Sequence, residues 1–235
     1  LTQRLIAALS APTAEGLLYE VDFRLRPSGN KGPIAVRLEA FDDYQINEAW
    51  TWEHMALTRA RVVAGPESFA TRVDASIRAV FARPCAKMRV REDVLSMRRL
   101  LEKEKEAVRV WNIKYVAGGQ VDIEFIAQYL LLIHGADHPL GRSTSTVEAL
   151  RRLADEGLLE PGTARELIDA AMLYQWVTQI SRLAVDDDFD PANVPRALRD
   201  LLARATEDQD IQDVEARLAR NQARVRAIFR AIVGE

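Results

Sequence analysis

Polar and apolar residues alternate strictly near the start of the chain. Residues 17–26 read Leu-Leu-Tyr-Glu-Val-Asp-Phe-Arg-Leu-Arg. Because the side chains of a strand point to opposite faces with a period of two, this pattern predicts a half-buried strand. Its outer face would carry Glu20, Asp22, Arg24 and Arg26. Residues 34–38 alternate again after a run rich in turn formers, so we expect the two segments to form a β-hairpin.

Helical spacing replaces the alternation after the predicted hairpin. Apolar residues now recur at steps of three and four. One helix is predicted over residues 41–64, with Tyr44, Trp50 and Trp52 in the core and Gly65-Pro66 as its stop. The other predicted helices cover residues 1–10, 67–81, 89–109, 121–134, 144–156, 162–185, 194–205 and 211–233. The short connections between them favour an antiparallel helical bundle.

The order of these elements predicts an α+β chain that is mainly α. Residues 1–64 would hold the short hairpin and residues 65–235 the helical bundle domain. An isolated hairpin is marginally stable in water, so we expect further strands or helices to cover its apolar face. The chain opens inside an amphipathic helix without a preceding Met, and we therefore expect it to begin inside a larger protein.

Composition narrows the class of protein. The chain has 235 residues, of which 48% are hydrophobic and 29% charged, and its net charge of -3 argues against nucleic acid as a partner. Apolar runs such as residues 129–133 are too short to cross a membrane, so we expect a cytoplasmic protein. Cys85 is the single cysteine, and with three histidines in the chain we expect no histidine metal site.

The charged face of the first predicted strand has two interpretations. Two carboxylates beside two guanidinium groups can hold a divalent cation and the phosphates that it bridges. Charged strand faces are also common as solvated edges with cross-strand ion pairs. The alternation alone leaves both interpretations open.

A second candidate site is the connection before the helix predicted at residue 121. Lys114, the pair Gly118-Gly119, Asp122 and Glu124 lie around the start of this helix. The N-terminus of a helix carries unpaired N–H groups and a partial positive charge. It either binds an anion, such as the phosphates of a nucleotide, or is capped by the chain's own two acids.

Several long runs resemble the glutamine synthetase adenylyltransferase family. They are Leu-Tyr-Glu-Val-Asp-Phe-Arg-Leu-Arg-Pro-Ser-Gly at 18–29, Asn-Glu-Ala-Trp-Thr-Trp-Glu-His at 47–54, and Gly-Gly-Gln-Val-Asp-Ile-Glu-Phe at 118–125. The first two are similar to the C-terminal half of these enzymes, which attaches AMP from ATP to glutamine synthetase. The other half removes AMP by phosphorolysis.

The resemblance implies a fold, a reaction and partners. The fold would be part of a nucleotidyltransferase palm of the polymerase-beta type, followed by a helical domain similar to that of PII-uridylyltransferases. Asp22 matches the third acid of the palm, which would hold Mg²⁺ on the phosphates of ATP, with Arg24 and Arg26 as phosphate partners. The acceptor would be a tyrosine of glutamine synthetase, and the enzyme would regulate nitrogen metabolism.

The chain departs from this family pattern at the metal site. The Gly-Ser-x-Asp-x-Asp segment that supplies the other two acids occurs nowhere in it, and Asp186-Asp187-Asp188 lacks the accompanying strand and glycine. We therefore expect that the chain alone neither binds Mg-ATP tightly nor transfers AMP.

Two other functions remain open. The helical domain could serve chiefly as a regulatory or docking module for glutamine synthetase, the PII signal protein or the effector glutamine. Uridylyl transfer to PII is a third hypothesis, against which the tryptophan-rich run argues by resemblance.

Overall fold

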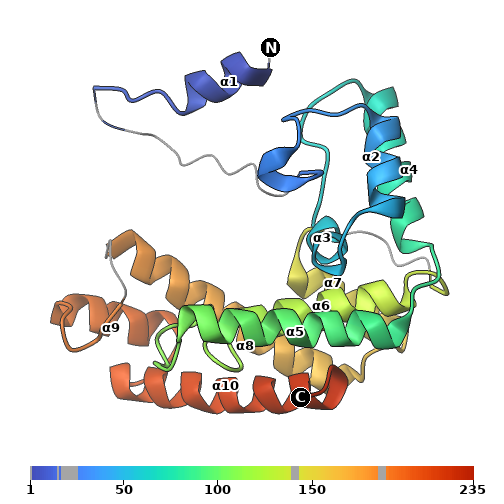
Figure 1. Cartoon of the computed structure of the whole chain (residues 1–235). Coiled ribbons are helices and arrows are strands. Elements are labelled where there is room, and N and C mark those ends of the chain that lie inside the picture. The colour runs from blue at the N-terminus through green and yellow to red at the C-terminus, as the bar shows by residue number, and fades with distance from the viewer. Residues whose placement is uncertain (1, 15, 17–25, 139–142, 185–188) are drawn as a thin grey trace. The chain divides into compact units, whose positions relative to one another are not determined.

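The computed structural model describes residues 2–14, 16, 26–138, 143–184 and 189–235 (Figure 1). This part of the chain is mainly helical, with α-helices α1 to α10 and one 3-10 helix. Its β structure is limited to an isolated antiparallel bridge between Thr13 and Gly16. The chain forms two compact units, Leu1–Val80 (unit 1) and Phe81–Glu235 (unit 2), which are described separately.

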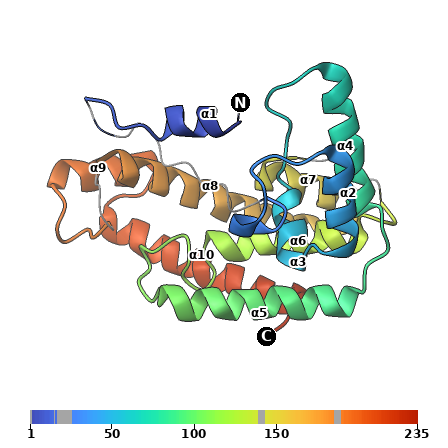
Figure 2. The ribbon, with the colours of Figure 1, turned by 45° about the horizontal axis from the view of Figure 1, so that its top comes forward.

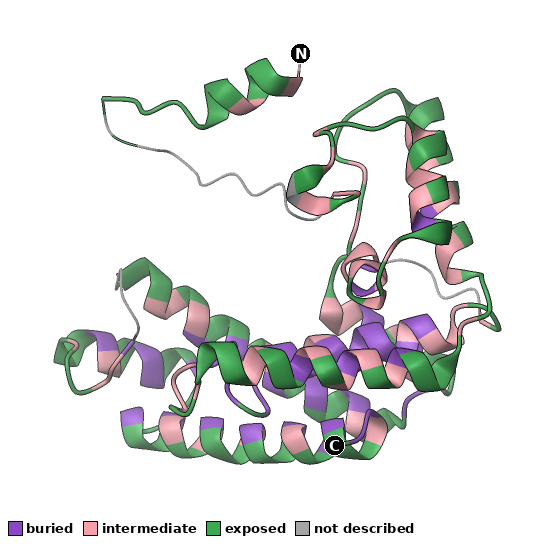
Figure 3. Ribbon diagram, in the orientation of Figure 1, coloured by how far each residue is buried: buried purple, intermediate pink, exposed green. Residues whose placement is uncertain are grey.

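The described part of unit 1 contains five helical elements. They are α1 (Thr2–Leu9), η1 (Gly29–Lys31), α2 (Leu38–Asn47), α3 (Thr51–Leu57) and α4 (Glu67–Phe81), whose last residue begins unit 2. Among the described apolar side chains of unit 1, only Met55 and Ile77 are buried (Figure 3). The helix expected at 67–81 is confirmed as α4.

The predicted hairpin is wrong in its second strand. Residues 34–37 form no strand, and Leu38 begins α2, where the N–H of Phe41 donates to the Arg37 carbonyl at 3.0 Å. Five alternating residues are too few to define a strand, and here Leu38 belongs to helical spacing with Phe41. Residues 17–25 of the first predicted strand lie outside the described part, so the nucleotidyltransferase palm stays a prediction.

The single helix predicted over residues 41–64 is also wrong. The Tyr44 carbonyl accepts the N–H groups of Glu48 and Ala49, both at 2.9 Å, and α2 ends there. The Glu53 carboxylate then accepts the Trp50 N–H at 2.9 Å and the Tyr44 hydroxyl at 2.8 Å, which caps the start of α3. Trp50 and Trp52 are not core residues, because they are 71% and 38% exposed.

Unit 2 contains the six remaining helices, all close to their predicted ranges. They are α5 (Lys87–Lys105), α6 (Gln120–His134), α7 (Thr146–Asp155), α8 (Pro161–Ala184), α9 (Arg196–Ala205) and α10 (Ile211–Ile232). The N-cap side chains of Ser145 and Asp210 accept the backbone N–H groups of Glu148 and Asp213 and so fix the starts of α7 and α10.

Helix α6 is the centre of unit 2. It packs against α5, α7, α8 and α10 (Figure 2). Most of its residues are buried. A helix that is apolar on nearly all sides can be stable only inside a protein, which explains why its neighbours surround it. No helix in the described part of the chain is long and apolar enough to cross a membrane.

Candidate functional site

The predicted catalytic residues lie at the edge of the described structure. Asp22 and Arg24 fall outside it. Arg26 is half-buried in unit 1, and its Nε donates to the Gly32 carbonyl at 3.4 Å. The described residues include no group of three His, Cys, Asp or Glu side chains that could hold a metal ion. The Mg²⁺ site therefore stays a prediction.

Asp122, at the start of α6, lies at the centre of a buried ion-pair network. Its side chain has no exposed surface and pairs with Arg98 of α5, which is 1% exposed. Its second oxygen accepts from Arg226 Nη1 of α10 at 3.2 Å and from the Gly118 N–H at 2.7 Å. The Asp122 carboxylate thus ties Gly118, which precedes the N-cap residue Gly119, to the start of α6, and it also joins three helices.

Glu102 of α5 completes the network. Its Oε1 lies 2.9 Å from Arg226 Nη2 and 3.4 Å from Arg98 Nη1. Two acids therefore face two arginines, so the charges of the network balance, with Arg98 and Asp122 as its buried pair. Buried charges are costly unless they are paired, and removing one partner of such a pair costs about 3–5 kcal/mol.

The double glycine permits close packing against the chain's own backbone. Gly118 has φ +78°, and a Cβ there would overlap the carbonyl group of Gln222 in α10. A Cβ on Gly119 would meet the Ile113 carbonyl. The Tyr174 hydroxyl of α8 donates to the Gly118 carbonyl at 2.9 Å, and burial raises the pKa of this tyrosine, with a smaller contribution from the Asp122 charge.

Arg98 of this network, Gln222 and backbone N–H groups all donate hydrogen bonds to the connection between α5 and α6. Arg98 Nη2 donates to the Tyr115 carbonyl at 3.1 Å and to the Val116 carbonyl at 3.2 Å. Gln222 Nε2 donates to the Val110 carbonyl at 2.7 Å. The N–H groups that open α6 donate to the carbonyls of Ile113 at 2.8 Å and Lys114 at 3.1 Å. Five carbonyls of residues 110–116 are thereby held.

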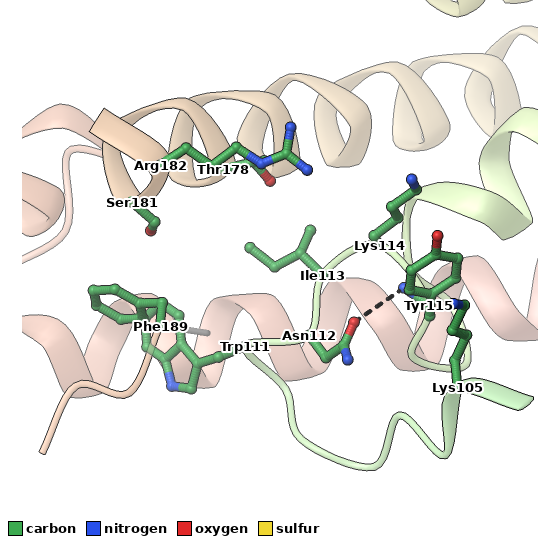
Figure 4. A pocket seen from close by; sticks show the side chains of 10 residues that line it. All are labelled: Lys105, Trp111, Asn112, Ile113, Lys114, Tyr115, Thr178, Ser181, Arg182 and Phe189. Carbon is green, nitrogen blue, oxygen red and sulfur yellow. Dashed lines mark hydrogen bonds between the residues drawn. The ribbon is translucent and has the colours of Figure 1, made fainter. Parts of the chain in front are cut away.

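A pocket of about 390 Å³ opens beside this connection (Figure 4). The lining residues come from the end of α5, the connection, the last turns of α8 and the segment before α9. They are Lys105, Trp111, Asn112, Ile113, Lys114, Tyr115, Thr178, Ser181, Arg182 and Phe189. Among the described residues, the lining contains three cationic side chains and no carboxylate.

The predicted nucleotide-binding residues are therefore divided between two places. Lys114 is exposed and lines the pocket, whereas Gly118, Gly119 and Asp122 are buried in the packed network. Glu124 is half-buried, and its Oε1 accepts from Gln120 Nε2 at 3.1 Å. What the five residues bind stays a prediction.

Sequence reasoning missed the partners of Asp122 and most of the pocket. A signal for Arg98 existed, because it follows Val90 and Val94 at steps of four on the buried stripe of α5. Gln222 occupies a comparable buried position between Leu218 and Val225 on α10. A polar residue on an apolar stripe is a candidate for a buried network. No pattern in the sequence indicated that Thr178, Ser181 and Arg182 of α8 line the pocket.

Comparisons with known proteins agree with the sequence pattern. The family model described as Glutamate-ammonia ligase adenylyltransferase matches residues 1–76, and the one described as GlnD PII-uridylyltransferase matches residues 86–233. A bifunctional glutamine synthetase adenylyltransferase/adenylyl-removing enzyme from Xanthobacter autotrophicus is 51% identical over 99% of this chain. Enzymes of the same name from Rhodopseudomonas palustris and Rhizobium meliloti are each 47% identical over 99% of it.

The chain spans about a quarter of the length of these relatives. The match extends over both units, and the residues that the second family model matches, 86–233, lie within unit 2. The chain therefore belongs to the glutamine synthetase adenylyltransferase family, with a domain of the PII-uridylyltransferase type in unit 2.

Proposed function

We propose that this chain is part of an enzyme that transfers AMP from ATP to a tyrosine of glutamine synthetase. The observation that carries the proposal is the 51% identity to the Xanthobacter autotrophicus enzyme over 99% of the chain. We assign the chain to the C-terminal, adenylylating half, because residues 18–29 and 47–54 resemble that half. Through this reaction the whole enzyme would regulate nitrogen assimilation.

In this proposal Asp22 is one of three carboxylates that hold Mg²⁺ on the phosphates of ATP. Divalent cations in such sites neutralise the developing charge as pyrophosphate leaves. Arg24 and Arg26 contribute forked donors suited to phosphate oxygens. The described residues contribute no metal-binding cluster, and the sequence contains no Gly-Ser-x-Asp-x-Asp segment. The other two acids must therefore come from elsewhere in the whole enzyme.

A chimeric enzyme tests the role of Asp22. The chain replaces the matching quarter of the Xanthobacter autotrophicus enzyme, and transfer of labelled AMP to glutamine synthetase is measured. Asp22→Asn should lower the rate on the order of a hundredfold or more, because a metal ligand is lost. Asp43→Asn, at an exposed position of α2, is the matched control and should leave the rate unchanged. Equal rates for the two variants would contradict the proposal.

A second candidate function is supported by the family match of residues 86–233. In this alternative unit 2 is a regulatory or docking module that receives glutamine synthetase, the PII protein or glutamine. Titration of the chain with PII or with glutamine, followed by the fluorescence of its four tryptophans, tests it. Glutamine synthetase is titrated in the same way. A saturable change in fluorescence with any of the three supports docking, and the absence of a change with PII, glutamine and glutamine synthetase excludes it.

A further inference from the structure

We propose that the pocket beside the connection between α5 and α6 binds a phosphate-bearing ligand with a planar ring, that is, a nucleotide. The residues described as lining the pocket all belong to unit 2, and they include no carboxylate that could hold the metal of the proposed AMP transfer. The inference therefore does not depend on that reaction.

The first support is the charge of the lining. Lys105, Lys114 and Arg182 contribute three positive charges and have no carboxylate partner in the described part of the chain. Tyr115 draws two of them together, because Lys105 Nζ lies 5.4 Å and Lys114 Nζ 4.9 Å from the centre of its ring. Cations brought together without a counter-ion repel each other, and a bound phosphate group would relieve this repulsion.

The second support is the combination of polar and apolar surfaces. The hydroxyl groups of Thr178 and Ser181 add neutral donors from α8 on the side of Arg182 (Figure 4). Opposite them lie Ile113 and the aromatic pair Trp111 and Phe189, whose ring centres are 4.8 Å apart. A planar ring can pack on the apolar side while its phosphates reach the cations, and aromatic surfaces tolerate any base.

The third support is size and rigidity. A volume of about 390 Å³ falls within the range of small-molecule pockets, about 300–1,000 Å³. The carbonyls of Tyr115 and Val116 are held by the buried Arg98, and that of Val110 by Gln222. A wall that is already ordered loses little conformational entropy on binding.

Calorimetric titration of the 235-residue chain with ATP, with EDTA present to remove divalent cations, tests the proposal. We expect saturable binding, and weaker binding of tripolyphosphate and of adenosine, since each offers only one half of the ligand. Lys114→Gln and Arg182→Gln should each weaken ATP binding about three- to tenfold, as expected for a lost charge-assisted hydrogen bond.

Lys103→Gln is the matched control, because Lys103 is exposed on α5 and does not line the pocket. It should leave ATP binding unchanged, and circular dichroism checks that every variant is folded. The indole N–H resonance of Trp111, assigned with Trp111→Phe, should shift on addition of ATP and thereby place the ligand in this pocket.

Three results would overturn the inference. They are the absence of saturable ATP binding, an effect of Lys103→Gln as large as that of Lys114→Gln, and loss of binding in Asp22→Asn with wild-type binding in Arg182→Gln. The last result would place the nucleotide with the proposed catalytic acid instead, so failure of this inference is distinguishable from failure of the proposed function.

Discussion

Unit 1 and unit 2 differ in how completely they bury their own side chains. The described part of unit 1 buries the apolar side chains of Met55 and Ile77 alone, and it leaves Trp50 largely exposed. In unit 2 four helices surround α6, and a charge-balanced ion-pair network holds the connection between α5 and α6. The proposed catalytic residues belong to unit 1 and the described pocket to unit 2. Among the described residues, the proposed chemistry therefore belongs to the unit that buries fewer of its apolar side chains.

The largest expected effect comes from breaking the buried network of unit 2. Asp122→Asn would leave Arg98 and Arg226 facing a neutral group and should lower the free energy of unfolding by about 3–5 kcal/mol. Urea unfolding followed by circular dichroism measures this change. Asp169→Asn, at an exposed position of α8, should change it by less than about 0.5 kcal/mol. A loss below about 1 kcal/mol for Asp122→Asn would show that the network contributes little to stability.

A pair of glycine variants separates close packing from backbone strain. Gly118 and Gly157 both have positive φ, but a Cβ on Gly157 would meet no atom within 4 Å. Gly157→Ala should therefore cost only the backbone strain, about 1–2 kcal/mol. Gly118→Ala should cost about 1–3 kcal/mol more, because its Cβ would displace α10 at Gln222. Equal losses in urea unfolding would mean that the close approach to Gln222 is not needed.

Tyr174 makes the stability of unit 2 depend on alkaline pH. Burial raises the pKa of its phenol above the ordinary 10.0, so the folded chain keeps a proton that the unfolded chain loses. Its contribution to stability is therefore complete below pH 10 and is lost as the pH rises further.

Tyr174→Phe tests this dependence. At pH 7 it should cost about 1 kcal/mol, the net value of the lost hydrogen bond to Gly118. Above pH 10 the stability of the variant should fall less steeply than that of the wild type. Thermal unfolding at a series of pH values measures both effects, and equal slopes above pH 10 would contradict the assignment.

The smallest effect is expected at the start of α8. The Glu160 carboxylate accepts the N–H groups of Gly162 at 2.8 Å and Thr163 at 2.6 Å, and these bonds lower its pKa below the usual value. Its contribution is present at neutral pH and is lost as the pH falls through this lowered pKa. Glu160→Gln should lower Tm by roughly 1–2 °C at pH 7 and less at pH 3. The exposed Glu104→Gln should change Tm at neither pH.

The sequence predicted the helices of unit 2 well, because the helical period of the apolar residues there matches the side chains that are buried in the packed structure. Helices α5 and α7 to α10 each carry an apolar stripe, α6 is apolar on nearly all sides, and the starts of α7 and α10 are marked by capping residues. In unit 1 the helix expected over 41–64 divides because the Glu53 side chain caps a new helix at Trp50. The strand expected at 34–38 was wrong because so short an alternation also fits the approach to a helix.

The candidate site was predictable only in part, because its partners are distant in the sequence. One interpretation of Asp122 was a cap on the helix that it opens, and its carboxylate accepts the N–H of Gly118, which precedes the N-cap residue Gly119. Its pairing with Arg98 and Arg226 depends on how α5 and α10 pack, which no local pattern contains. Lys114 was identified from its place beside the double glycine, whereas Arg182 of α8 joins it in the pocket through tertiary packing.

In the proposed function, the AMP-transfer site needs two metal-binding aspartates besides Asp22, and the Gly-Ser-x-Asp-x-Asp segment that would carry them does not occur in this sequence. The most direct test is to incubate the purified 235-residue chain with glutamine synthetase, Mg²⁺ and labelled ATP, beside the chimeric full-length enzyme. We predict AMP on glutamine synthetase with the chimera and none above background with the chain. Steady AMP incorporation by the chain alone, abolished by Asp22→Asn, would contradict the claim.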